Sequence, residues 1–279
     1  MRIETDSQMS VGWLIVPFLP IIFIVLFIVS IIIGALASVP TFNSTTGTPT
    51  TATAPFLVAF GVFFLLFFIG IIVAAILSAI MLYKLAKRRN THFQRQLLLY
   101  EDLLNMAKEV SSKKGVDVSM HLNNMDRTLR EARIEETEKS AALWTILSLI
   151  TGIATLYVFY YLMKDFFKHE RREDQFFEDL NRTLAAAGVP VNLPRRTLPV
   201  PDRSFILYFI LSLITVQIFS IYWIYVLLTD PNNHFRQQWM IEDTIIAQIS
   251  PVLGGPSMPP PSSPPPPSTS GFTLPPSSP

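Results

Sequence analysis

Cysteine is absent from this chain of 279 residues, which excludes a disulfide framework, a thiol nucleophile and any zinc or iron-sulfur site built on cysteine. Charge is also scarce: charged residues make up 15% of the chain and the net charge is +1, which argues against a nucleic-acid-binding surface. The motifs GxSxG, GxxxxGK[ST] and HExxH do not occur. Hydrolase, kinase and nucleotide-binding chemistry therefore have no support, and we expect a protein without enzymatic activity.

Long apolar stretches dominate what is present, and 50% of the residues are hydrophobic. Four stretches contain no Asp, Glu, Lys, Arg or His, namely 11–38, 55–82, 141–163 and 204–228. Because about 20 apolar residues cross a hydrocarbon core of roughly 30 Å, the sequence predicts an all-α, multi-pass protein of the cell membrane with four spans. A cleaved signal peptide is the alternative for the first stretch, but its apolar region is about twice the usual length.

The polar segments complete the predicted organisation. Residues 39–54 contain no Lys or Arg, whereas 83–140 contain 12 of the 22, which places the latter segment in the cytoplasm. We expect the following order: a cytoplasmic N-terminus (1–10), a first transmembrane helix (11–38), a Thr/Ser-rich outer loop (39–54), a second helix (55–82), a charged helical hairpin (83–140), a third helix with an amphipathic tail (141–187), a Pro-rich linker (188–203), a fourth helix with an amphipathic tail (204–249) and a disordered Pro-rich tail (250–279).

Basic residues conflict with four straight spans. Eight Lys and Arg residues lie in 164–203, which four spans would place on the outer side. Either acidic neighbours weaken the orientation rule there, or the third and fourth spans are bent, with a half-depth hairpin at Thr151-Gly152. Backbone groups exposed to lipid need hydrogen-bond partners, so four single spans are the preferred expectation.

An internal repeat connects three of the apolar stretches to their polar tails. Ile146-Leu-Ser-Leu-Ile-Thr151 recurs as Ile210-Leu-Ser-Leu-Ile-Thr215. A tyrosine then precedes a histidine by nine residues in three places, and an acidic pair follows each histidine. These sets are Tyr83, His92 and Glu101-Asp102; Tyr160, His169 and Glu178-Asp179; and Tyr225, His234 and Glu242-Asp243.

The run Ile214-Thr-Val-Gln-Ile-Phe-Ser-Ile-Tyr-Trp-Ile-Tyr225, followed by Asp230 and His234-Phe235, resembles an uncharacterised prokaryotic membrane family, domain of unknown function 4234. Its signature reads I-T-x-G-I-Y-x-I-Y-W-x-Y before D-x-x-x-H, and its multi-pass members look archaeal. Gln217 stands where the signature has the glycine that Gly152 keeps, which weakens the case for a glycine-dependent bend in the fourth span. The resemblance implies a membrane architecture and no activity.

A metal site built from His92, His169, His234 and the acidic pairs is the most specific chemical hypothesis, because imidazole and carboxylate suit zinc or iron. However, nine helical residues turn about 900°, so the histidine and the acidic pair of one unit face opposite ways. Contacts between units would have to assemble the site, and four alternating spans would separate the tails. We therefore predict no metal site, no cofactor and no catalytic residue. If a metal were bound, His92, His169 and His234 would be the candidate ligands.

A scaffold or interaction role in the membrane is the expected function. The expected partners are the lipid bilayer and proteins that bind the cytoplasmic helices or the Pro-rich tail; nucleic acid is not expected. Gly70, Ala74 and Ser78 form a face of small residues that suits an oligomer contact. A small transporter or channel subunit is the first alternative, although the spans lack the ionisable residues of an ion path. A metal-binding membrane protein is the second alternative.

Overall fold

The computed structural model describes residues 2–37, 41–42, 49–50 and 53–252, and these residues are almost entirely helical. The elements are α1 (Arg2–Thr5), the 3-10 helix η1 (Val11–Ile15), α2 (Phe18–Ala37), the two-residue strands β1 (Thr41–Phe42) and β2 (Pro49–Thr50), α3 (Thr53–Lys114), α4 (Ser119–Glu135), α5 (Ala141–Thr151), α6 (Ile153–Ala186), α7 (Phe205–Ile214) and α8 (Ile218–Ile249). The all-α fold class is confirmed. The predicted Pro-rich tail lies outside the described residues from 253 onward.

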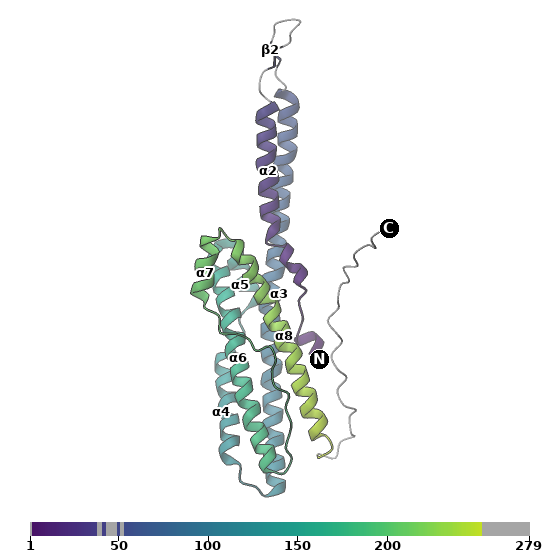
Figure 1. The fold of residues 1–279 in the computed structure, drawn as a ribbon, viewed down its shortest axis with the longest axis vertical. Helices are drawn as coiled ribbons and strands as arrows, with labels where there is room; N and C mark the ends of the chain where they lie inside the picture. Colours follow the sequence, from purple (N-terminus) through teal and green to yellow (C-terminus); the bar gives the residue numbers. More distant parts are fainter. Residues whose placement is uncertain (1, 38–40, 43–48, 51–52, 253–279) are drawn as a thin grey trace, which may run out of the picture.

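Two apolar helices extend from one end of a helical bundle (Figure 1). α2 packs along the first half of α3, and the second half of α3 runs on into the bundle with α4, α6 and α8. Within the described residues, two helical segments are long and apolar enough to cross a membrane, Val11–Leu36 and Phe60–Lys114. In the second segment the uncharged stretch ends at Leu82. The prediction of four spans is therefore not confirmed.

Each of the expected third and fourth spans is a pair of helices joined by a tight turn. α5 and α6 meet at Gly152, which has a φ of 61°, and α7 and α8 meet at 215–217, where Val216 and Gln217 have φ values of 50° and 69°. Gln217 is in the left-handed conformation, with φ 69° and ψ 0°, whereas Gly152 has φ 61° and ψ −41°. Both residues have a positive φ, so the second bend forms without glycine. Because the chain turns back at both of these sites, α6 and α8 enter the bundle beside α3 (Figure 1).

The charged hairpin expected over 83–140 corresponds to the end of α3 and to α4. Gly115 ends α3 with a φ of 64°, and the Asp117 carboxylate accepts a hydrogen bond from the Ser119 amide at 3.0 Å at the start of α4. α3 does not break between its apolar half and its charged half, so the membrane-length helix carries the first repeat tail into the bundle directly.

Pro231 lies inside α8, where a proline would usually break or kink the helix. Proline has no N–H, which leaves the carbonyl four residues earlier without its helical donor. The Arg88 guanidinium of α3 donates to this Leu227 carbonyl and also to Leu228 and Asn232. A buried arginine from another repeat therefore compensates for the proline, and α8 continues.

The face of small residues on α3 packs within the chain. Gly70 and Ala74 are buried, and a Cβ added at Gly70 would lie 2.4 Å from the ring of Phe23 in α2. The expected close helix contact therefore exists, with α2 as its partner. The predicted oligomer through this face is not tested by that contact.

Candidate metal centre

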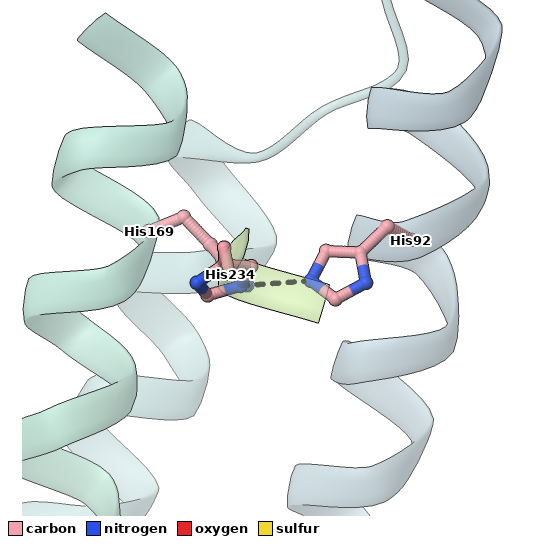
Figure 2. Close-up of side chains that lie close together, drawn as sticks. All are labelled: His92, His169 and His234. Atoms are coloured by element: carbon pink, nitrogen blue, oxygen red, sulfur yellow. Dashed lines mark hydrogen bonds between the residues drawn. The ribbon is translucent and has the colours of Figure 1, made fainter. Parts of the chain in front are cut away.

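Three histidines from three repeat units meet in the middle of the bundle (Figure 2). His92 lies on α3, His169 on α6 and His234 on α8, and none of them has exposed surface. One ring nitrogen from each lies within 4.8 Å of the other two. The Nε2 atoms of His92 and His234 are 3.2 Å apart, and the Nε2 atom of His169 has no hydrogen-bond partner.

The imidazole rings form a nearly equilateral triangle. Their centroids are separated by 5.1, 5.1 and 5.3 Å, and their planes cross at 79°, 86° and 72°. The rings are thus edge-on to one another and do not stack. This arrangement leaves a central point that the nitrogens of all three rings can approach.

A different carboxylate holds the Nδ1 atom of each ring. Asp6 is 2.8 Å from Nδ1 of His92, Glu136 is 3.0 Å from Nδ1 of His169, and Glu170 is 2.8 Å from Nδ1 of His234. Asp6 follows α1, Glu136 follows α4, and Glu170 lies on α6. The three carboxylates therefore orient the rings from outside, and Nε2 is the nitrogen that remains toward the centre.

Ionisation decides which nitrogen carries the proton. Burial opposes the charge of Asp6 and Glu136, but both pKa values are held below their usual range. At Asp6 the causes are the hydrogen bond with His92 and the charge of Arg95, and at Glu136 they are the hydrogen bond with His169 and the charge of Arg172. An ionised carboxylate only accepts hydrogen bonds, so Nδ1 of His92 and of His169 must donate. Burial also lowers the pKa of His92 to about 4, so this ring is neutral at pH 7 with a lone pair on Nε2.

Nε2 of His234 faces Nε2 of His92. Burial and then the positive charge of Arg196 lower the pKa of His234 well below the usual value, so this ring is neutral too. Nδ1 of His234 lies 2.8 Å from Glu170, whose pKa is raised by burial, and an Nδ1 that donates to Glu170 leaves the Nε2 lone pair facing that of His92 across 3.2 Å. Two acceptors at this distance repel unless a proton or a cation lies between them. Two imidazoles on a tetrahedral zinc ion hold their nitrogens ~3.3 Å apart, as zinc–nitrogen bonds of about 2.0–2.1 Å require.

Glu173 supplies an oxygen beside the three nitrogens. It lies one helical turn after His169 on α6, is fully buried, and has Oε2 at 3.7 Å from Nε2 of His234. Gln96 donates to its other oxygen at 2.6 Å, and Arg196 of the linker forms an ion pair with it. Burial raises the pKa of Glu173 to about 7 despite Arg196. A cation at the centre would favour the ionised form of this carboxyl.

Three phenylalanines cover one side of the centre. The Phe93 ring stacks on His169 with centroids 4.3 Å apart, and the Phe235 ring lies 4.5 Å from His92. Phe166 lies against both of these phenylalanines. An apolar cover of this kind limits water and lowers the local dielectric constant around polar ligands.

A cavity of about 240 Å³ lies next to the site, beside the carboxylate that contacts His169. Glu136 lines this cavity and also binds Nδ1 of His169. The other residues that line it are Arg89, Phe93, Glu135, Asp165, Lys168 and Arg172. Glu135 and Lys168 are partly exposed, so the cavity leads from the surface to the carboxylate next to the histidines.

The histidine candidates are all present at the centre, but the acidic pairs predicted with them are not. Glu101 pairs with Arg133, Asp179 with His121, and Glu242 with Arg95. The expectation that alternating spans would separate the tails is also incorrect for this structure, because the two hairpins bring α6 and α8 to the same end of the molecule as the tail of α3 (Figure 1).

Sequence reasoning missed Asp6, Glu136, Glu170 and Glu173. One signal was available for Glu173: the residue four positions after each histidine is polar, and residues four apart share a helix face. These residues are Gln96, Glu173 and Gln238, and all three are fully buried. Nothing in the spacing of Asp6 or Glu136 indicates that they reach the histidines.

No protein-family model, curated protein or solved structure matches the chain. The class of protein is therefore given by the fold alone: a chain with two membrane-length apolar helices and a helical bundle that encloses three histidines. The resemblance to domain of unknown function 4234 stays a prediction.

Proposed function

We propose that this protein is an integral membrane protein whose bundle binds one divalent transition-metal ion through Nε2 of His92, His169 and His234. One observation carries the proposal: three buried imidazoles have a carboxylate at each Nδ1 atom, and one ring nitrogen from each lies within 4.8 Å of the other two. Metal-binding histidines typically donate their second N–H to a carboxylate in this way, which fixes the ring and raises its basicity.

The donor set favours zinc. Imidazole nitrogen suits zinc, copper, iron and nickel, whereas calcium and magnesium prefer oxygen, and the chain has no cysteine thiolate to favour copper(I). Three histidines with Glu173 at 3.7 Å from one of their nitrogens supply four donors, the number that zinc takes in structural sites. The distance from Oε2 of Glu173 to Nε2 of His234 exceeds by a few tenths of an ångström the ~3.3 Å that separates two ligands on a tetrahedral ion.

A structural role fits the surroundings of the site. The three ligands come from α3, α6 and α8, so one ion ties the three repeat tails together. The free energy of metal binding then contributes directly to the stability of the bundle. The proposed activity is therefore that of a metal-stabilised membrane scaffold, which joins the expected interaction role with the metal-binding alternative.

Membrane attachment through α2 and the apolar half of α3 completes the proposal. Residues 11–82 contain no Lys, Arg, Asp or Glu, so this part offers no charged path for an ion across the membrane. Transport therefore has less support than a scaffold. The basic residues of 83–140 support a cytoplasmic location for the bundle, in which its surface would meet protein partners.

Metal analysis of the purified protein tests this function. We expect about one zinc ion per chain in the wild type, and close to none in a variant with His92, His169 and His234 all changed to alanine. His121→Ala is the matched control, because His121 pairs with Asp179 away from the centre. The conservative change His169→Gln keeps the volume of the side chain and should also lose the ion. Equal zinc content in the wild type and the triple variant would show that the histidines share protons in place of a metal.

A further inference from the structure

The tips of the two hairpins expose large apolar side chains. Ile150 and Ile153 flank the turn of the first hairpin and are 73% and 76% exposed. In the second hairpin, Val216 at the turn is 83% exposed, with Ile214 and Ile218 on either side at 72% and 68%. No other described segment covers these tips. Side chains of this type at two equivalent turns need an apolar surrounding.

The turns satisfy their own backbone groups. Thr151 and Thr215 end the two copies of the repeated sequence Ile-Leu-Ser-Leu-Ile-Thr. The hydroxyl of each makes the same kinds of hydrogen bond with the nearby backbone. Thr151 Oγ1 accepts from the Ala154 amide at 3.3 Å, and Thr215 Oγ1 accepts from the Phe219 amide at 2.9 Å. Each hydroxyl also donates to the carbonyl four residues earlier. Non-helical backbone needs such partners if it is to enter lipid.

The apolar arms reach half of a membrane. α5 has 11 residues and α7 has 10, which at about 1.5 Å per residue gives helices of ~15–16 Å. The hydrocarbon core of a bilayer is about 30 Å thick. An arm that starts at one surface therefore ends near the middle of the bilayer, where the chain turns back.

Charge distribution supports the same arrangement. The chain has 22 Lys and Arg residues and none within 11–82, so two crossings by α2 and α3 leave all 22 on one side if both hairpins return to that side. Four straight spans would place the eight in 164–203 on the other side. The return of both hairpins therefore removes the conflict with the orientation rule.

Tyrosines mark the depth at which the hairpins would leave the lipid. Tyr157 and Tyr160 on α6 and their repeat equivalents Tyr222 and Tyr225 on α8 are all at least 40% exposed. Tyrosine is enriched where a membrane protein passes through the headgroup region. Lys164 and Asp230 follow within a few residues, so polar chain begins where the interface is expected.

From these observations we infer that α5–α6 and α7–α8 are half-inserted hairpins, whose tips lie among the acyl chains of the bundle-side leaflet next to α2 and α3. The occupant of their exposed apolar surface is lipid. This inference does not depend on the metal site. It implies that residues 214–225, the segment that resembles domain of unknown function 4234, contact lipid.

Labelling of single cysteines tests the side on which the linker lies, because the native chain has no cysteine. An impermeant maleimide is applied to inside-out and right-side-out vesicles that contain Arg195→Cys or Ser112→Cys. The linker position and the end of α3 are both exposed. We expect both variants to label from the same side. Labelling of Arg195→Cys from the opposite side would establish straight spans and overturn the inference.

Depth measurement tests the lipid contact itself. A fluorophore on Ile153→Cys or Ile218→Cys should be quenched most by phospholipids that carry a nitroxide deep in the acyl chain, while the same fluorophore on Ser112→Cys should not be quenched. Both tip positions are exposed, so substitution leaves the packing intact. Absence of quenching together with cross-linking between two chains at Ile218→Cys would show that a second copy covers the tips and would overturn the inference.

Discussion

The apolar half and the bundle half of this molecule are stabilised in opposite ways. Residues 11–82 contain no charged side chain, and α2 and α3 bring large apolar residues to the surface along this part. In the bundle, Arg89, His92 and Glu173 are fully buried and are paired with Asp165, Asp6 and Arg196. The first half depends on an apolar environment outside the chain. The second depends on polar groups that different repeat units supply to one another, since a buried charge without a partner is strongly unfavourable.

The repeat units depend on one another in the bundle but not in the hairpins. In the hairpins the repeated Ile-Leu-Ser-Leu-Ile-Thr gives each copy its own turn, closed by Thr151 or Thr215 without help from the other copy. In the bundle no copy is complete, because each contributes one histidine to a shared centre. Changes to the centre should therefore affect all three tails, whereas changes to a turn should remain local.

Metal removal should have the largest effect, and only in the bundle. Saturating zinc at 1,000 times its dissociation constant stabilises a folded protein by about 4 kcal/mol. We therefore expect a chelator to lower the thermal midpoint of the detergent-solubilised wild type by several degrees, followed by the loss of helical circular dichroism. The triple histidine variant should melt at one temperature with or without chelator. If chelator left the wild-type midpoint unchanged, no bound metal would stabilise the bundle, and the proposed difference in how the two halves are stabilised would be wrong.

The metal-free bundle should show two opposing pH trends. The pKa of His92 is about 4 in the folded chain against 6.5 unfolded, so the unfolded chain takes up more protons as pH falls and stability decreases, by roughly 2–3 kcal/mol between pH 6.5 and 4.5. Glu173 has a folded pKa of about 7 against 4.5 unfolded, so its contribution decreases as pH rises through the same window.

Replacement of Glu173 separates these trends. In the metal-free wild type Glu173 offsets part of the loss that His92 and His234 cause, so the thermal midpoint should fall less between pH 6.5 and 4.5 than it does without this carboxyl. Glu173→Gln keeps the shape of the side chain without its titration, so its midpoint should fall clearly as pH decreases. If both proteins gave parallel curves, the assignment of opposite signs to His92 and Glu173 would be incorrect.

Glu136→Gln should weaken the centre without abolishing it. The amide can still contact Nδ1 of His169, but it loses the negative charge that raises the basicity of the ring. Removal of such a partner typically reduces metal affinity 10–100-fold. Competition titration with a zinc chelator measures this change. Glu138→Gln is the control, since Glu138 pairs with Gln94 at the surface, and its affinity should equal that of the wild type.

The smallest predicted effects lie in the two turns and have opposite signs. Gly152→Ala places a side chain at a φ of 61° and should destabilise the first hairpin by about 1 kcal/mol, whereas Gln217→Gly relieves a φ of 69° and should stabilise the second by a similar or smaller amount. Proteolysis of the loops next to the hairpins, measured in nanodiscs, reports local opening. Equal protease sensitivity in both variants would show that turn conformation does not limit either hairpin.

Hydropathy was sufficient to predict the helical class, the apolar helices and the charged hairpin of α3 and α4. It could not show that Ala141–Met163 bends, because a turn whose polar groups bond locally through Thr151 leaves the hydropathy unchanged. Gln217 was also misleading: the sequence signature suggested a need for glycine, and the structure places glutamine at a positive φ in the second turn.

The site was predictable only in part. The nine-residue step from tyrosine to histidine identified His92, His169 and His234 as equivalent positions. The helical-wheel argument then considered each unit alone, and it correctly placed the acidic pairs elsewhere. The carboxylates at the centre come from distant segments: Asp6 is 86 residues from His92, and Glu136 is 33 residues from His169. Contacts over such separations are set by tertiary packing, which spacing along one helix does not report.

X-ray absorption spectroscopy of the zinc-loaded protein tests the central claim most directly. The account predicts a four-coordinate ion with three imidazole nitrogens at about 2.0–2.1 Å and one oxygen, and it predicts that the oxygen changes in Glu173→Gln while the three nitrogens remain. A spectrum with fewer than three imidazole ligands, or one that is the same in the variant without His92, His169 and His234, would contradict it.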